Sequence, residues 1–141
     1  MIINRIVIDT NVIVAGLRSR AGASFQLIDQ ISSKTFEPAV SVPLLMEYES
    51  VLLRNGMVPV SAAQVNDLLD YICSVAHFQE IHYLWRPTLP DPKDDLVLEL
   101  AVNAEAETIV THNIRDFRGS EMFGVRVETP RQFLLRLKGN K

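Results

Sequence analysis

The stretch Ile-Val-Ile-Asp-Thr-Asn-Val-Ile-Val-Ala-Gly-Leu, residues 6–17, decides the fold of this 141-residue chain. Its first three residues are apolar and β-branched, which predicts a central parallel strand with both faces buried. The strand gives way to Asp9, Thr10 and Asn11 before apolar residues resume. Ligands bind at the carboxyl ends of strands in open α/β sheets, so a carboxylate here is a candidate for chemistry. The structural alternative is that Asp9 or Asn11 caps a following helical turn.

Length and composition predict one ordinary globular domain over residues 1–141, with a frayed tail in the last few residues. A content of 48% hydrophobic and 22% charged residues argues against disorder. The sequence has no apolar run of membrane-spanning length and no basic region typical of a signal peptide, so we expect no membrane association and a cytoplasmic location. The single cysteine, Cys73, is flanked by apolar residues at helical spacing and is expected to be a buried structural thiol.

The charge is unevenly distributed along the chain. A net charge of −3 argues at first against a nucleic-acid partner. From residue 115 onward, however, seven basic residues stand against three acidic ones. A basic C-terminal third beside an acidic pocket would suit a polyanion, although an ordinary solvated face would have the same composition. The candidate contacts for such a polyanion are Arg115, Arg118 and two residues expected in an early loop, Arg18 and Arg20.

Strand and helix patterns alternate along the rest of the chain. Helical spacing predicts helices over residues 24–33, 42–54, 61–76, 94–104 and 130–137. Short β-type runs predict strands over residues 35–41, 107–111 and 124–128, and a short strand or extended segment over residues 79–84. Alternation with short connections predicts an α/β fold, a three-layer α/β/α sandwich with a central parallel sheet of four or five strands.

Four carboxylates fall at expected strand ends or on the helical turns next to them: Asp9, Glu47, Asp95 and Asp116. Each has a structural alternative, since a lone helical glutamate is commonly exposed and acidic residues are favoured at helix N-termini. Asp94 and Asp95 are adjacent and exceed what one helix cap needs. We favour Asp95 for the site because it directly precedes the apolar run of its helix.

Gathering four carboxylates without a cation would be strongly unfavourable, so these residues either bind a divalent metal or do not meet. Oxygen ligands without cysteine or paired histidine favour Mg²⁺ or Mn²⁺ over zinc. One or two such ions would activate a water for in-line attack on a phosphodiester, with no covalent intermediate.

Four sequence blocks occur in order across nearly the whole chain. They are Val-Ile-Asp-Thr-Asn-Val at 7–12, Ser-Val-Pro-Leu-Leu-Met-Glu at 41–47, Asp-Pro-Lys-Asp-Asp-Leu-Val-Leu-Glu-Leu-Ala at 91–101 and Val-Thr-His-Asn-Ile-Arg-Asp-Phe at 110–117. Together they resemble the PIN-domain family, and in particular VapC-like ribonucleases, the toxin components of toxin–antitoxin systems. The resemblance implies a five-stranded parallel sheet and a Mg²⁺- or Mn²⁺-dependent endoribonuclease.

By the same resemblance, the four carboxylates named above are the metal-binding and catalytic acids. Thr10, Asn11, Asp94 and Thr111 are their supporting neighbours. Asn113 is a further ligand, and because many relatives carry aspartate there, the number of bound ions stays open. The implied partners are an RNA substrate, a cognate antitoxin whose peptide occupies the acidic groove, and a second copy of the chain in a homodimer.

Three other functions remain open at this point. The first is a housekeeping RNA-processing nuclease of the same family, and the second is a non-catalytic PIN-like binding module. The third, an aspartate-based phosphoryl-transfer domain, would want an Asp-x-Asp after the first strand. Asn11 stands where the second aspartate should be.

Overall fold

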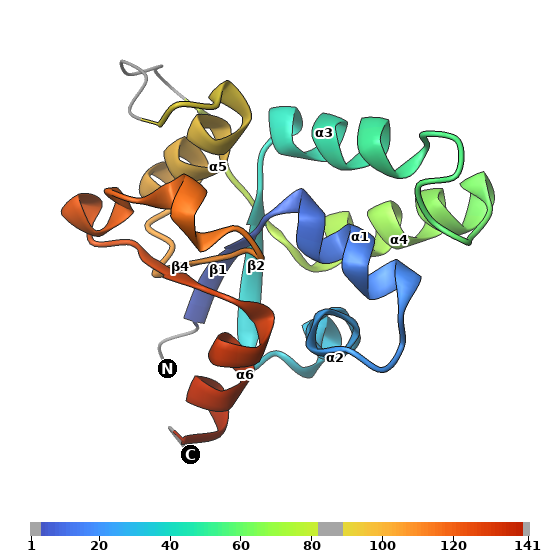
Figure 1. Cartoon of the computed structure of the whole chain (residues 1–141), viewed down its shortest axis with the longest axis horizontal. Coiled ribbons are helices and arrows are strands. Elements are labelled where there is room, and N and C mark those ends of the chain that lie inside the picture. Colours follow the sequence, from blue (N-terminus) through green and yellow to red (C-terminus); the bar gives the residue numbers. More distant parts are fainter. Residues whose placement is uncertain (1–3, 82–88, 140–141) are drawn as a thin grey trace.

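The computed structural model describes residues 4–81 and 89–139 of the chain, and it places a five-stranded sheet at the centre (Figure 1). All neighbouring strands are parallel, in the order β3-β2-β1-β4-β5. The strands are β1 (Asn4–Ile8), β2 (Phe36–Val40), β3 (His77–Phe78), β4 (Thr108–Val110) and β5 (Arg126–Glu128). The predicted central parallel strand is therefore confirmed, because β1 lies in the middle of the sheet with both neighbours parallel to it.

Burial explains why this stretch forms the centre. Ile6, Val7 and Ile8 are at most 2% exposed, and Ile6 is paired both with Pro38 of β2 and with Thr108 of β4. A strand with two neighbours and two covered faces needs β-branched residues at consecutive positions rather than at alternate ones. The sequence 6–8 meets this requirement.

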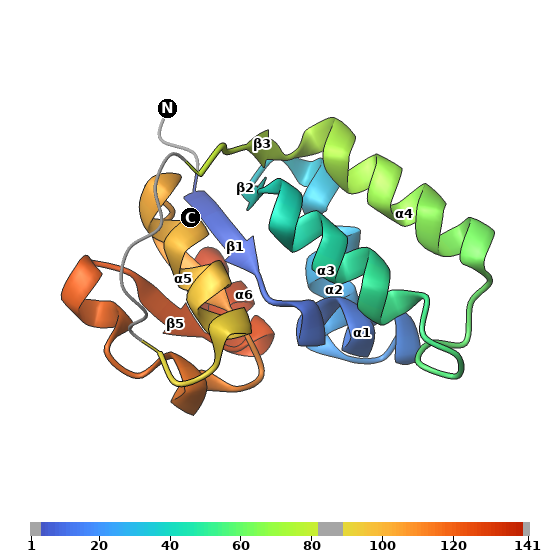
Figure 2. The same cartoon turned by 90° about the horizontal axis from the view of Figure 1, so that it is seen from above.

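Helices cover both faces of the sheet, which confirms the predicted α/β/α sandwich; in Figure 2, α5 lies in front of the sheet and α6 behind it. Three short 3₁₀ helices, η1 (Ile31–Ser33), η2 (Ile114–Phe117) and η3 (Ser120–Phe123), lie in the connections. The helices are α1 (Thr10–Arg18), α2 (Ala23–Asp29), α3 (Val42–Leu52), α4 (Ala62–Val75), α5 (Pro92–Asn103) and α6 (Pro130–Gly139). No helix in the described part of the chain is long and apolar enough to cross a membrane.

Several local predictions differ from the structure. The strand or extended segment expected over 79–84 begins earlier, because His77 and Phe78 of β3 pair with the end of β2 and the backbone N–H of Gln79 still donates to the carbonyl of Val40 at 2.8 Å; residues 82–84 lie outside the described residues. Arg18 is the last residue of α1 rather than part of a loop. Cys73 is exposed rather than buried, since the buried positions of α4 are Val65, Leu69 and Ile72.

The connections gather polar residues at one end of the sheet. The chain leaves β1 for β2 and β3 on one side and then crosses to β4 and β5 on the other. Such a reversal of strand order opens a crevice at the carboxyl ends of the strands. Asp9 follows β1 and Thr111 follows β4 at this crevice.

Candidate functional site

Asp9 lies at the junction of β1 and β4 and is only 9% exposed. Its backbone N–H donates to the carbonyl of Val110 at 2.9 Å, which extends the β1–β4 pairing by one residue. Both carboxylate oxygens are held: Oδ1 accepts from the backbone N–H of Thr10 at 2.9 Å, and Oδ2 accepts from Thr111 Oγ1 at 2.8 Å. Asp9 is thus the N-cap residue of α1, as the structural alternative proposed, and also a carboxylate fixed at the end of the central strand.

Thr111 connects the loops that follow β1 and β4. Its hydroxyl is fully buried, donates to Asp9, and accepts from the backbone N–H of Asn113 at 3.0 Å and from Asn11 Nδ2 at 3.4 Å. The oxygen of the Asn11 side chain accepts from the backbone N–H of His112 at 3.2 Å. These contacts fix the Asp9 carboxylate and shape the chain at residues 111–113, as orienting neighbours would.

Glu47 approaches Asp9 from α3. This helix starts with Ser41 as its N-cap, whose Oγ accepts from the backbone N–H of Leu44 at 3.3 Å. Two turns later the half-buried Glu47 accepts a long hydrogen bond of 3.4 Å from Thr10 Oγ1. The next residue, Tyr48, is buried, and its hydroxyl donates to the carbonyl of Ile8. Burial, followed by the negative charges of Asp9 and Glu47, raises the pKa of the Tyr48 hydroxyl, so it stays a donor.

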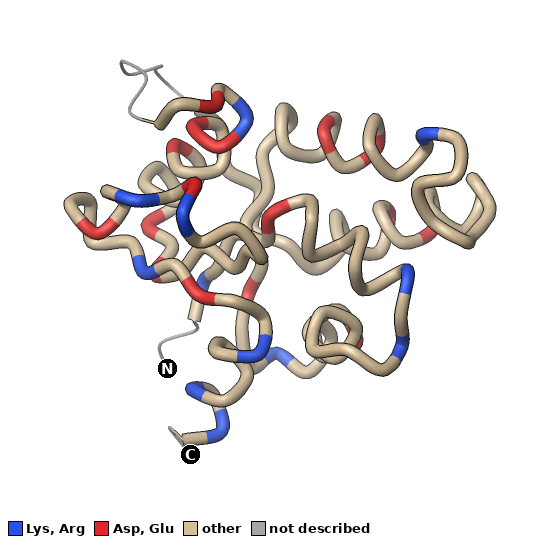
Figure 3. The backbone as a smooth tube through the Cα atoms, viewed as in Figure 1, with Lys and Arg blue, Asp and Glu red and all other residues tan. Residues whose placement is uncertain are grey.

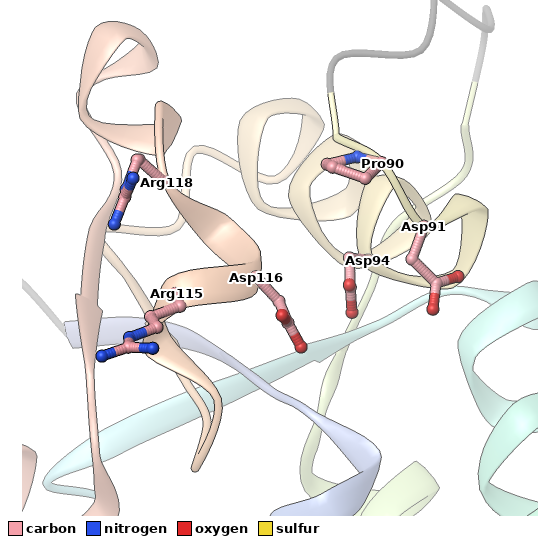
Figure 4. Close-up of a pocket in the computed structure, with 6 residues that line it drawn as sticks. All are labelled: Pro90, Asp91, Asp94, Arg115, Asp116 and Arg118. Atoms are coloured by element: carbon pink, nitrogen blue, oxygen red, sulfur yellow. The ribbon is translucent and has the colours of Figure 1, made fainter.

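The two adjacent aspartates of α5 have different environments. The Oδ1 of Asp95 accepts from the backbone N–H of Leu89 at 2.9 Å and so closes the loop before the helix. Asp94 instead points into a pocket that it shares with Asp91 and Asp116 (Figure 4). Asp94 and Asp95 therefore face different sides of α5: Asp94 lines the pocket, and the sequence-based choice of Asp95 as a site residue stays a prediction. The physical reason is helix geometry: consecutive residues are turned by about 100° around the axis, so only one of two neighbours faces a given side.

The pocket has a volume of about 510 Å³ and lies between the first turn of α5 and η2. In Figure 4 the carboxylates of Asp94 and Asp116 point into the same space, while the guanidinium groups of Arg115 and Arg118 lie on the far side of Asp116. Figure 3 shows the same arrangement at the level of the chain, with acidic positions on α5 and η2 around the start of α1. The lining residues are Pro90, Asp91, Asp94, Arg115, Asp116 and Arg118.

Only part of the predicted basic surface lies at this pocket. Arg115 and Arg118 line it, whereas Arg18 Nε donates to the carbonyl of Met57 at 2.8 Å and thereby holds the α3–α4 connection. Arg20 is exposed in the α1–α2 connection. On α6, Arg136 pairs with a carboxylate of β5 and so belongs to the scaffold.

The carboxylates influence one another electrostatically. The pKa of Asp9 is raised first by burial and then by the charges of Glu47 and Asp116, against the lowering effect of its hydrogen bonds. The pKa of Asp94 is raised to about 7, first by partial burial and then by the charges of Asp9, Asp91, Asp116 and Asp95, in that order. Ionising every member of this group at neutral pH is therefore costly unless a cation is added.

The donor set fits a hydrated hard cation. In residues 4–81 and 89–139, no group of three or more acidic, histidine or cysteine side chains is placed to hold a metal ion by itself. Mg²⁺ does not require one, since it commonly keeps several waters and uses one or two carboxylates. Asp9, Asp94 and Asp116, with Glu47 nearby, supply only oxygen donors, and a divalent ion would offset the repulsion that helps to raise the pKa values of Asp9 and Asp94. Asn113 lies at the start of η2.

Sequence reasoning missed two residues of this region. Asp91 was not considered, although it caps α5 by accepting from the backbone N–H of Lys93 at 2.9 Å and lines the pocket. Tyr48 was not predicted to take part in the site. The available signal for Tyr48 was its position directly after Glu47, which places it beside whatever Glu47 approaches.

The fold and the site together define a class of protein: a parallel α/β sandwich with an acidic pocket at the carboxyl ends of its strands. The sequence model of the PIN domain matches residues 5–115. The chain belongs to the PIN domain family. This confirms the resemblance drawn from the four sequence blocks.

The structure is also similar to one from the crystal structure of VapBC2 from Rickettsia felis bound to a DNA fragment from their promoter. The TM-score is 0.61 at 17% sequence identity, and the match covers 89% of this chain and 98% of that chain. At this identity the similarity concerns the fold. A search of curated protein sequences gave no match.

Proposed function

We propose that this protein is a metal-dependent endoribonuclease of the VapC type, the toxin of a toxin–antitoxin pair. The observation that carries the proposal is the position of Asp9. Its carboxylate is nearly buried at the end of the central strand and feels the charges of Glu47 and Asp116, while Asp94 feels the charge of Asp9 in turn. A purely structural helix cap would not require this concentration of negative charge.

In this proposal each residue has a defined task. Asp9, Asp94 and Asp116 would hold Mg²⁺ or Mn²⁺, with Glu47 and Asn113 completing the environment, and Asp95 would support the α5 loop instead. A bound ion would supply a water activated for in-line attack on an RNA phosphodiester. Thr111 keeps the Asp9 carboxylate in one orientation through its 2.8 Å hydrogen bond.

The basic residues have a separate task in binding the substrate. Arg115 and Arg118 flank Asp116 on the side away from Asp94 and would contact RNA phosphates beside the acidic pocket. The pairing of cations with an acidic pocket lets a polyanion approach a site that would otherwise repel it.

We further propose that a cognate antitoxin binds this chain in the cytoplasm and that the protein forms a homodimer. The structurally similar VapBC2 is described as bound to promoter DNA, which supports a toxin–antitoxin context for the fold. The α3 helix also exposes apolar side chains, with Val42 at 52% and Met46 at 64%. Exposed apolar side chains of this size on one helix are suited to a protein interface.

The second candidate function is a non-catalytic binding module with a PIN fold. It is favoured by the absence of a complete three-residue metal cage among the residues that the structure describes. The two functions differ in metal binding, because the module would bind neither Mg²⁺ nor Mn²⁺ at the acidic pocket.

The deciding experiment combines RNA cleavage with calorimetry. Wild-type protein, Asp9→Asn and the control Glu49→Gln are incubated with a mixed RNA pool in Mg²⁺, Mn²⁺ or EDTA. Glu49 is an exposed residue of α3, so its substitution removes one negative charge outside the site. We expect metal-dependent cleavage by the wild type and the control, and none by Asp9→Asn. Undiminished cleavage by Asp9→Asn, or a wild type that neither cleaves RNA nor binds Mn²⁺ in a titration, would refute the proposal.

A further inference from the structure

Tyr48 joins the two chain segments that carry Asp9 and Glu47. Its ring is 2% exposed, and its hydroxyl donates to the carbonyl of Ile8. Ile8 immediately precedes Asp9, and Tyr48 immediately follows Glu47. A single hydrogen bond therefore connects the neighbours of two site carboxylates that lie far apart in the sequence.

A second contact acts in parallel with the first. Thr10, the residue after Asp9, donates its hydroxyl to Glu47 Oε2 at 3.4 Å. Residues 8–10 and 47–48 are thus linked by two hydrogen bonds, which we call the β1–α3 clamp. Because the Thr10 bond is long, the Tyr48 bond contributes most to this clamp.

Packing alone does not explain a tyrosine at this position. The buried residues of α3 are Leu44, Tyr48 and Leu52, spaced four residues apart on one helix face. An apolar side chain at the middle position would fill the same face, whereas a buried hydroxyl is costly unless it is hydrogen-bonded. The Tyr48 hydroxyl satisfies this requirement by donating to the carbonyl of Ile8 at the end of β1, beside the site.

We propose that Tyr48 is a positioning residue that sets the separation between the Asp9 and Glu47 carboxylates and thereby the affinity for the divalent ion. This inference rests on the proposed metal-dependent function. Tyr48 contacts neither the ion nor the substrate and acts through the placement of its neighbours. Removing a group that orients metal ligands without touching the metal typically lowers the metal affinity by about 10- to 100-fold.

The test is Mn²⁺ titration calorimetry on Tyr48→Phe beside the wild type, together with thermal unfolding in EDTA. Phenylalanine keeps the ring and removes only the hydroxyl, so the dissociation constant for Mn²⁺ is expected to rise about tenfold. The control is Ser61→Ala. Ser61 forms the capping box of α4 with Gln64, so its loss lowers stability without touching any site residue. The control is expected to keep the wild-type Mn²⁺ affinity.

A double-mutant cycle separates positioning from general destabilisation. If Tyr48 acts through Glu47, Tyr48→Phe should weaken Mn²⁺ binding much less in a Glu47→Gln background than in the wild type. Equal effects in the two backgrounds would overturn the inference. So would a Tyr48→Phe variant that binds Mn²⁺ like the wild type.

A second variant keeps the inference testable if Tyr48→Phe does not fold. Glu47→Asp draws the same carboxylate back by one methylene and leaves Tyr48 in place, so it is also expected to weaken Mn²⁺ binding. Wild-type affinity in Glu47→Asp would refute the premise that this separation matters. A wild-type protein that binds no Mn²⁺ would refute the proposed function itself, which distinguishes the two failures.

Discussion

Replacing Asp94 with asparagine is expected to stabilise the metal-free protein at neutral and alkaline pH. The folded carboxyl has a pKa of about 7, compared with 3.8 for an unperturbed aspartate. Between these two values the folded protein binds a proton that the unfolded chain has already lost. Ionisation of Asp94 therefore opposes folding increasingly as the pH rises through this window.

The size of the effect follows from this difference in pKa. About three pH units at about 1.4 kcal/mol each would give about 4 kcal/mol for a fully buried carboxyl. Asp94 is only partly buried, and solvent screens its neighbours, so we expect about 1–2 kcal/mol to remain. For a chain of this length the unfolding entropy is about 0.3 kcal/mol per kelvin, which translates into a rise in Tm of about 3–7 °C.

The assay is thermal unfolding of wild type and Asp94→Asn in EDTA, followed by circular dichroism across the pH window. The difference in Tm should be close to zero near pH 4, where both side chains are neutral, and largest near pH 8. Addition of Mn²⁺ should reverse the order, because the ion stabilises the wild type more than the variant. Asp70→Asn, which removes an exposed charge from α4, is the control and should show little dependence on pH.

Two results would refute this reasoning. One is a Tm difference between wild type and Asp94→Asn that does not change with pH. The other is a lower Tm for the variant than for the wild type near pH 8 in EDTA. The first result would mean that folding does not change the pKa of Asp94, and the second that the ionised side chain forms a stabilising contact.

Three further substitutions test other parts of the structure. Thr111→Val removes the donor to Asp9 and should raise the Mn²⁺ dissociation constant by about 10- to 100-fold, as calorimetry would measure; unchanged affinity would contradict an orienting role. Gly16→Ala places a methyl group 3.2 Å from the carbonyl oxygen of Ser24, so it should cost about 1–3 kcal/mol in urea unfolding; wild-type stability would show that α1 and α2 can separate freely. Replacing Arg115 and Arg118 by alanine should reduce the salt dependence of RNA binding by a slope of about 2, and an unchanged slope would place the phosphate contacts elsewhere.

The central strand of the fold could be predicted because its residue pattern is typical of a strand buried on both faces. Three consecutive β-branched residues at 6–8 suit only a strand covered on both faces, and Asp9 ends that strand. The position of Asp9 at the strand end then follows from topology, without knowledge of any side-chain contact.

The rest depended on rotations and contacts that sequence patterns do not fix. Asp94 and Asp95 are equivalent as acidic residues at a helix start, and only the structure distinguishes them: Asp95 accepts a hydrogen bond from the backbone N–H of Leu89, whereas Asp94 lines the pocket. Cys73 follows the buried Ile72, and one residue of rotation on α4 moves it to the surface. In each case the sequence pattern fits either of two neighbouring residues, but their side chains point in different directions.

The order of the strands has a consequence for folding during synthesis on the ribosome. β1 is made early, but its neighbour β4, which brings Thr111 to Asp9, is made only after the helices α1 to α5. A nascent chain that ends before residue 116 lacks Asp116 altogether and cannot assemble the pocket. The acidic site therefore cannot assemble until synthesis has passed residue 118, so a nuclease built this way would be inactive while only its first four helices had been made.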